Sequence, residues 1–138
     1  MQNIAIVGYN NTLAKNILEL MSLRGYDENN IKIYADNVQK NTIISFGETE
    51  LKVDDVKNLK TADFSAIIFT DSEKTATTYI PKFAKENIRI INATKAFTGE
   101  NDIPVIVGGI NESSLEKAVK NTINVPHPYV VEFLSAIV

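Results

Sequence analysis

Short apolar runs rich in Ile and Val recur along the chain and alternate with segments of helical spacing. A run of this kind, continuous rather than alternating with polar residues, is typical of a strand buried on both faces of a parallel sheet. The runs are Ile4–Val7, 31–34, Ala66–Phe69, Arg89–Asn92, 105–107 and 122–125. Strands that alternate with helices predict an α/β fold with a mainly parallel sheet, formed by residues 1–138 as a single domain.

The segments between the first runs carry helix signals. Apolar residues recur at helical spacing from Leu13 to Met21, and Gly25 follows where a C-terminal cap is expected. A second helical pattern extends to Glu86 and contains Pro81. Because proline lacks a backbone N–H, we expect it to kink or shift that helix.

Two further segments contain residues that predict a hairpin turn and short helices. Residues 42–53 predict a β-hairpin around Gly47, followed by one or two helical turns over 53–59. Residues 115–120 predict a short helix, for which Ser113 and Glu116 have the spacing of a capping box.

The composition excludes several kinds of site. The chain has no cysteine and one histidine, His127, which excludes disulfides, thiolate metal sites and thiol nucleophiles. Acidic residues form no cluster of ligands, so no metal is expected. The net charge of -3 is spread without runs, and nucleic acid is not an expected partner.

Nothing in the sequence predicts a membrane or secreted protein. No stretch approaches the roughly 20 apolar residues that cross a bilayer. Residues 1–8 lack a basic segment followed by a longer apolar one, so no secretory signal is expected. The expected location is the cytoplasm.

The turn after the first strand resembles a dinucleotide fingerprint. Such a fingerprint places three glycines at the turn, at the pyrophosphate and at the helix contact, and here the positions hold Gly8, Asn11 and Ala14. Alanine is permitted at the third position. Asparagine tolerates a positive φ better than other non-glycine residues, so a functional turn is sterically possible with Asn11 in place.

Longer motifs resemble those of aspartate-semialdehyde dehydrogenases. Residues 4–8 (IAIVG) are similar to the opening of that family, residues 79–82 (YIPK) to its Y-A-P-K helix, and Ala96-Phe97 to the A-F of its N-S-S-A-F-R segment. Residues 103–111 (IPVIVGGIN) follow its V-P-L-V-V-P-E-V-N. The resemblance covers nearly the whole chain but only the N-terminal portion of the family. It implies a Rossmann-like, doubly wound nucleotide-binding domain of an NADP-dependent semialdehyde oxidoreductase of amino-acid biosynthesis.

In this sequence, the catalytic cysteine of that family and the arginine of its A-F-R segment are replaced. Its N-P-N-C segment, whose cysteine attacks the aldehyde, corresponds to residues 125–128, so the nucleophile's place is taken by Pro128. The arginine after A-F is Thr98, and the family's substrate domain is expected to be absent. Loss of a covalent nucleophile typically costs on the order of a millionfold in rate. We therefore expect no catalytic residue and no activity from this chain alone, and we interpret His127 as a solvated loop residue.

The resemblance also implies which residues would contact NAD or NADP. They follow the strand ends, where ligands bind in open α/β sheets. These candidates are Gly8, Asn10, Asn11, Thr12, Leu13, Asp36, Asn37, Thr70, Asp71 and Thr94. Asp36 would repel a 2'-phosphate and accept from a ribose diol, which favours NAD, although it could equally cap a turn. Because Asn11 replaces a glycine, binding is expected to be weak or absent.

The sequence is compatible with three functions. One is an inactive descendant of the dehydrogenase that still binds cofactor, and another is a non-catalytic interaction or regulatory subunit. The third, an enzyme completed by another chain, is disfavoured because the partner would also have to supply the cysteine. The tail that starts at Tyr129 and ends at Val138 is apolar on most of a helical circumference, and predicts a homodimer through this segment.

Overall fold

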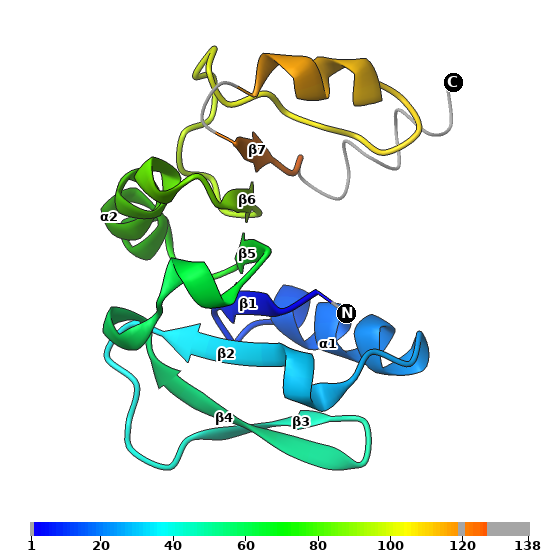
Figure 1. Ribbon diagram of the computed structural model, residues 1–138, viewed down its shortest axis with the longest axis vertical. Coiled ribbons are helices and arrows are strands. Elements are labelled where there is room, and N and C mark those ends of the chain that lie inside the picture. Colours follow the sequence, from blue (N-terminus) through cyan, green and yellow to red (C-terminus); the bar gives the residue numbers. More distant parts are fainter. Residues whose placement is uncertain (1, 119–120, 127–138) are drawn as a thin grey trace.

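A computed structural model of the protein describes residues 2–118 and 121–126. Within them the chain forms a seven-stranded sheet of order β3-β4-β2-β1-β5-β6-β7 (Figure 1). The strands are β1 (Ile4–Val7), β2 (Ile31–Ala35), β3 (Ile43–Phe46), β4 (Thr49–Asp55), β5 (Ala66–Phe69), β6 (Arg89–Asn92) and β7 (Thr122–Asn124). Every neighbouring pair is parallel except β3 and β4. The chain builds outward from β1 on both sides, which confirms the expected doubly wound α/β fold.

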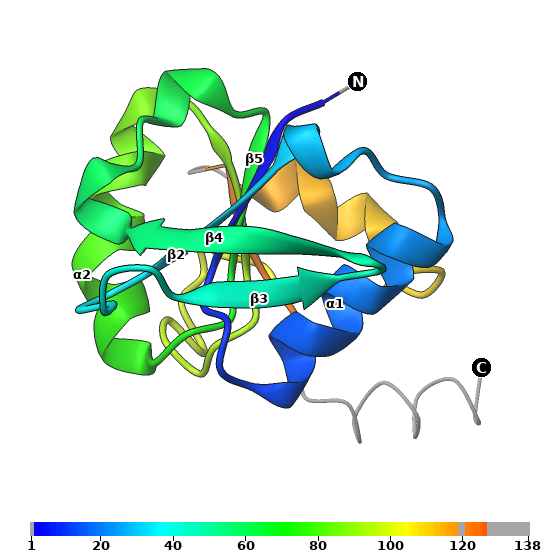
Figure 2. The same ribbon diagram turned by 90° about the horizontal axis from the view of Figure 1, so that it is seen from below.

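Helices cover both faces of the sheet. Helix α2 (Glu73–Phe83) lies on one face, and α1 (Thr12–Leu23) lies on the other together with the 3-10 helix η5 (Glu112–Lys117), as Figure 2 shows. The remaining 3-10 helices are η1 (Glu28–Asn30), η2 (Val56–Asn58), η3 (Thr61–Asp63) and η4 (Ala84–Glu86). None of the helices in the described part of the chain has the length and hydropathy needed to cross a bilayer.

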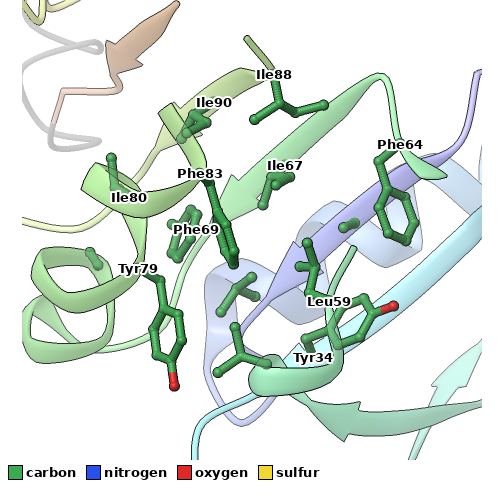
Figure 3. Close-up of a cluster of buried hydrophobic side chains, with 14 of the residues drawn as sticks. Tyr34, Leu59, Phe64, Ile67, Phe69, Tyr79, Ile80, Phe83, Ile88 and Ile90 are labelled. Carbon is green, nitrogen blue, oxygen red and sulfur yellow. The ribbon is translucent and has the colours of Figure 1, made fainter. Parts of the chain in front are cut away.

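The core is divided by the sheet into two clusters. The cluster under α2 joins Ile67 and Phe69 of β5 to Tyr79 and Phe83 of the helix (Figure 3). Under α1, Ile6 of β1 and its neighbours on β2 and β4 meet the buried face of the helix. Successive residues of a strand point to opposite faces, so a run of consecutive apolar residues supplies both clusters.

Helix α1 ends in a Schellman motif, as the position of Gly25 predicted. Gly25 has a φ of +74°, its N–H donates to the carbonyl of Ser22 at 3.0 Å, and the N–H of Tyr26 donates to Met21 at 3.0 Å. These two bonds satisfy carbonyls that the end of a helix leaves without partners.

The hairpin prediction is confirmed and the proline prediction is modified. β3 and β4 pair antiparallel around Gly47, and η2 supplies the expected short turn after β4. Helix α2 is continuous through Pro81 and passes into η4 only after Phe83. The ring removes one hydrogen bond near the end of the helix, and the turns before it continue regardless.

Two sequence predictions between residues 105 and 120 are wrong. Residues 105–107 form no strand, since the pairing is an isolated bridge between Val105 and Asn124. Ile106 donates to the carbonyl of Asn124 and Asn124 to that of Pro104, both at 2.9 Å. The next partner, Pro126, has no N–H to extend the pairing. The N–H of Val107 donates to the side chain of Asn111 at 2.7 Å, where the chain turns away.

The helix near the end of the described residues is the 3-10 helix η5, which begins at Glu112 rather than Leu115. Glu112 binds the N–H of Gly109 at 2.9 Å, and no side-chain hydrogen bond caps the helix. The capping box of Ser113 and Glu116 is therefore not formed.

Candidate functional site

The turn after β1 lies at the centre of the sheet's carboxyl edge. β1 pairs with β2 on one side and β5 on the other, so the turn separates the two halves of the fold. Gly8 donates to the carbonyl of Tyr34 at 2.8 Å, while Thr70 and Asp71 donate their backbone N–H groups to Val7 at 2.8 and 3.1 Å. The loop after β5 is therefore hydrogen-bonded to the end of β1, and the turn after β1 is hydrogen-bonded to β2.

Gly8 is required at this turn for two separate reasons. Its φ is +118°, a conformation that residues with a Cβ rarely adopt. A Cβ there would also overlap Thr70 Oγ1 and lie 2.7 Å from the backbone nitrogen of Asp71. The glycine thus permits the loop after β5 to approach the turn closely.

Asn11 has a different role from the one that its position in the fingerprint predicted. Its φ is -148°, so the turn does not use the positive φ that asparagine would tolerate. The residue is the N-cap of α1, and its Oδ1 accepts from the N–H of Ala14 at 2.8 Å. Its Nδ2 donates to the carbonyl of Thr70 at 3.0 Å. The side chain that replaces glycine is therefore fixed between the helix and the second loop.

The first turn of α1 keeps backbone donors at the edge of the sheet. The N–H groups of Thr12 and Leu13 have no acceptor within the helix, as holds for the first residues of any α-helix. Thr12, Leu13 and the preceding Asn10 are exposed. The positive end of the helix dipole adds to these donors, so the turn can accept an anionic group.

A cavity of about 830 Å³ opens beside this turn, over the carboxyl ends of β5, β6 and β7. We call it the carboxyl-edge cavity. Its lining is Leu13, Asp71, Glu73, Ala93, Thr94, Lys95, Thr98, Val105, Asn124, Val125 and Pro126. The walls are mostly apolar, and two carboxylates and one ammonium group stand among them. Such a mixture suits an organic ligand with a few polar groups.

Two buried asparagines hold the loop that borders the cavity. Asn92 and Asn124 end the paired strands β6 and β7, and Asn92 Nδ2 donates to Asn124 Oδ1 at 2.9 Å. Asn92 also donates to the carbonyl of Ala96 at 2.8 Å and accepts from the hydroxyl of Thr94 at 2.7 Å. Asn124 donates to the carbonyl of Phe97 at 3.1 Å. Residues 93–98 are thereby fixed to the ends of both strands.

A separate group of residues follows β2. Asp36 is half-buried, and Asn37 is exposed with a φ of +54°. Tyr79 of α2 lies nearby with its hydroxyl directed away from the core cluster (Figure 3). Burial raises the pKa of Tyr79 above its ordinary value, and the carboxylate of Asp36 raises it further. Lys57 opposes this rise, and the hydroxyl of Tyr79 stays protonated at neutral pH.

The structure brings together some of the predicted site residues and separates others. Leu13, Asp71 and Thr94 line the carboxyl-edge cavity. Gly8, Asn11 and Thr70 form the contact between the loops. Asp36 and Asn37 lie at the end of β2 and do not line the cavity.

Sequence reasoning missed several residues of the cavity, notably Glu73, Val105 and Asn124. Asn124 had a usable signal, because it is a polar residue at the end of an apolar strand, as Asn92 is. Val105 had none, because its place depends on a turn that the sequence did not reveal.

Several predictions concern residues outside the described part of the chain. These are His127, the replacement of the family cysteine by Pro128, and the dimer-forming tail from Tyr129 onward. Within residues 2–118 and 121–126, no group of three His, Cys, Asp or Glu side chains could hold a metal ion.

Comparison with known proteins agrees with this geometry. Residues 3–118 match the model of the semialdehyde dehydrogenase, NAD binding domain, family. The chain is 26% identical over 136 residues to the aspartate-semialdehyde dehydrogenase of Rickettsia conorii, covering 98% of this chain and 40% of that protein. The chain thus spans about two fifths of the length of this curated relative.

Solved structures share the fold. Aspartate semialdehyde dehydrogenase II from Vibrio cholerae superposes with a TM-score of 0.89 at 20% identity, over 99% of this chain and 41% of that one. The Candida albicans enzyme with NADP gives a TM-score of 0.59 at 11% identity, over 78% of this chain and 33% of that one. Since the family model matches most of its length, the chain belongs to the NAD-binding domain family of the semialdehyde dehydrogenases.

Proposed function

We propose that the protein binds a nicotinamide adenine dinucleotide across the carboxyl edge of its sheet. The observation that carries the proposal is the turn from Gly8 to Leu13, which presents the N-terminus of α1 at the point where the chain leaves β1 between β2 and β5. Dinucleotides bind at such a switch point, with the pyrophosphate at the helix N-terminus. The name of the matching family and the NADP complex of the Candida albicans enzyme support the same ligand class.

The two halves of the ligand would lie on opposite sides of this turn. The ribose of the adenosine half is bound at the end of the second strand in such folds, which here is Asp36. The other half would extend toward β5 and β6, where the carboxyl-edge cavity has room for it.

We expect NAD to bind better than NADP. The carboxylate of Asp36 can accept hydrogen bonds from the two ribose hydroxyls, whereas a 2'-phosphate there would meet a like charge. Asp36 receives no side-chain hydrogen bond from the described residues, so its oxygens are available to a ligand.

The affinity for NAD is expected to be low. The Oδ1 of Asn11 accepts the hydrogen bond of the Ala14 N–H, so this N–H is not available to a phosphate. The Asn11 side chain also lies where the fingerprint has a glycine. We expect a dissociation constant nearer millimolar than micromolar, which corresponds to about 4 kcal/mol.

Titration of 15N-labelled protein with NAD, NADP and ADP tests the proposal. NAD is expected to shift the amide signals of residues 8–14 and to bind more tightly than NADP. Asn11→Gly should bind NAD more tightly than the wild type, because it removes the side chain from the place of the pyrophosphate and frees the N–H of Ala14. Its stability should fall by about 1 kcal/mol through the lost bond to Thr70 and by a few tenths through the cap. Binding of none of the three nucleotides would contradict the proposal, and a sub-micromolar constant would contradict its affinity.

We further propose that the chain does not catalyse phosphate-dependent oxidation of aspartate semialdehyde. Oxidation through a thiohemiacetal requires a thiolate, and the sequence has no cysteine. Turnover by protein purified free of host enzyme would contradict this. Without this activity, the protein would act as a cofactor-binding or regulatory component.

A second candidate function is that of an interaction platform. Leu20 and Leu23 of α1 are 54% and 77% exposed, and the sequence from Tyr129 to Val138 is mostly apolar. We propose that the chain self-associates through this tail, most simply as a twofold homodimer. Light scattering tests this: a monomer at micromolar concentration would rule the dimer out, and a dimer that persists without the residues from Tyr129 would locate the interface elsewhere.

A further inference from the structure

The Asn92–Asn124 pair is a fully satisfied polar group in an otherwise apolar part of the core. Asn92 is completely buried and Asn124 nearly so. Asn92 donates to Ala96 and Asn124, and its Oδ1 accepts from the N–H and the hydroxyl of Thr94 at 3.1 and 2.7 Å. A buried amide is unfavourable unless it is hydrogen-bonded, and Asn92 uses both its donors and its acceptor.

Most of these bonds end on one loop rather than on the sheet. Residues 93–98 receive bonds at Thr94, Ala96 and Phe97, and Thr94 Oγ1 also accepts from the N–H of Ala96 at 3.2 Å. Phe97 has a φ of +60°. A non-glycine residue keeps that conformation only where its surroundings hold it.

The same loop carries one wall of the carboxyl-edge cavity. Thr94, Lys95 and Thr98 all line it, and Lys95 is the only cationic side chain among its described lining residues. Lys95 is exposed, and the hydroxyl of Thr98 donates to its carbonyl at 2.6 Å. The backbone of this wall is thus fixed from the buried side of the loop.

We infer that the Asn92–Asn124 pair is a positioning device that holds the 93–98 loop in place for the non-adenosine half of the dinucleotide. The inference rests on the proposed function, since it assigns that half to the cavity. Asn92 lies outside the cavity lining and acts through the loop, whereas Asn124 both holds the loop and lines the cavity. Removing the pair should therefore weaken binding of the whole dinucleotide without affecting its adenosine half.

The double variant Asn92→Leu/Asn124→Leu releases the loop without leaving one of the two amides unpaired. Replacing both partners of a hydrogen bond by apolar groups of similar shape can be nearly neutral, whereas replacing one leaves the other unsatisfied. Asn92→Ala, which leaves every described lining residue of the cavity in place, is a second variant in case the double variant does not fold. Ile90→Val, in the same strand and buried under α2, is the matched control for a change in core packing.

Limited trypsin digestion measures how firmly the 93–98 loop is held, and nucleotide titration measures binding at the site. We expect faster cleavage after Lys95 in the loop variants, with cleavage after Lys74 of α2 unchanged. If the loop is in position a tenth of the time, the affinity for NAD falls about tenfold. The affinity for ADP should stay within about twofold, and Ile90→Val should behave as the wild type in both assays.

Each alternative outcome contradicts a different step. Unchanged cleavage after Lys95 would show that the pair does not hold the loop. Faster cleavage with unchanged NAD affinity would show that the loop is not part of the site, and equal losses for NAD and ADP would show a general effect on the fold. If the wild type binds neither nucleotide, the proposed function itself is wrong and the inference about positioning is wrong with it.

Discussion

Asn11 Nδ2 donates a 3.0 Å hydrogen bond to the carbonyl of Thr70, which lies 59 positions further along the chain. Because the same side chain caps α1 through Ala14, one residue joins the start of the helix to the loop after β5. A ligand at the turn would therefore meet two loops that are already fixed relative to each other.

Asn11→Ala should destabilise the protein by about 2 kcal/mol. About 1 kcal/mol comes from the lost cap and about 1 kcal/mol from the lost bond to Thr70. Urea denaturation measures the change as a lower midpoint with an unchanged slope. Asn10→Ala is the control, since its exposed side chain makes no hydrogen bond to the described residues. Equal midpoints for the two variants would contradict the double role of Asn11.

Gly8→Ala should cost far more stability than Gly99→Ala. Both glycines have a positive φ, +118° at Gly8 and +85° at Gly99, so both substitutions strain the backbone. At Gly99 no heavy atom lies within 4 Å of the added Cβ, whereas at Gly8 the loop after β5 must move. We expect a difference of about 1 to 3 kcal/mol in the free energy of unfolding, the usual cost of overpacking. Similar losses in thermal or urea unfolding would show that the approach of the two loops is not tight.

Asp36→Asn should shift the nucleotide preference from NAD toward NADP. Removing one charge beside the ribose changes the relative affinity by about 1 kcal/mol, or roughly fivefold. The measurement is the ratio of the two dissociation constants for the wild type and the variant. Asp63→Asn, on the exposed η3, is a control of equal charge change. A ratio that does not move in Asp36→Asn would place the ribose elsewhere.

Stability should fall at alkaline pH because of two buried tyrosines. Burial raises the pKa of Tyr34 and Tyr79 in the folded protein, and nearby carboxylates, led by Asp54 and Asp36 respectively, raise it further. The folded state then holds these protons more tightly than the unfolded state, in which the pKa is about 10. The contribution is fully present below that pH and is lost as the pH rises through the folded-state values.

The double variant Tyr34→Phe/Tyr79→Phe isolates this contribution from that of the lysines. Its free energy of unfolding should decline less steeply above pH 10 than that of the wild type, with the two curves parallel below pH 9. Curves that stay parallel through pH 11 would show that neither phenol titrates differently on unfolding.

The strands and the hairpin could be predicted from the sequence because their signals are local. Ile67 and Ile68 face opposite sides of the sheet, and only a doubly covered strand needs both to be apolar. Gly47 likewise predicts the hairpin turn from its immediate neighbours. The family resemblance then added the connectivity that periodicity alone does not give.

The failures occurred where long-range contacts determine the local structure. Val105 is apolar and β-branched, yet it forms only a bridge to Asn124, because Pro126 on the partner segment has no N–H to continue the pairing. The φ of Asn11 depends on the start of α1 and on Thr70, neither of which a fingerprint describes. For the candidate site, local signals pointed to Gly8 and to the residues at strand ends, whereas the Asn92–Asn124 pair joins two strands that are distant in sequence and as a pair has no local signal.

The central position of β1 has a consequence for how the chain folds as it is synthesised. β3 and β4 are adjacent in sequence and can pair as soon as both have left the ribosome, whereas Val7 contacts Thr70 across 63 positions. One edge of β1 must therefore remain open until β5 has been made. An open, apolar strand edge is a template for pairing with other chains, so the earliest strand synthesised is also the one most exposed to aggregation before folding is complete.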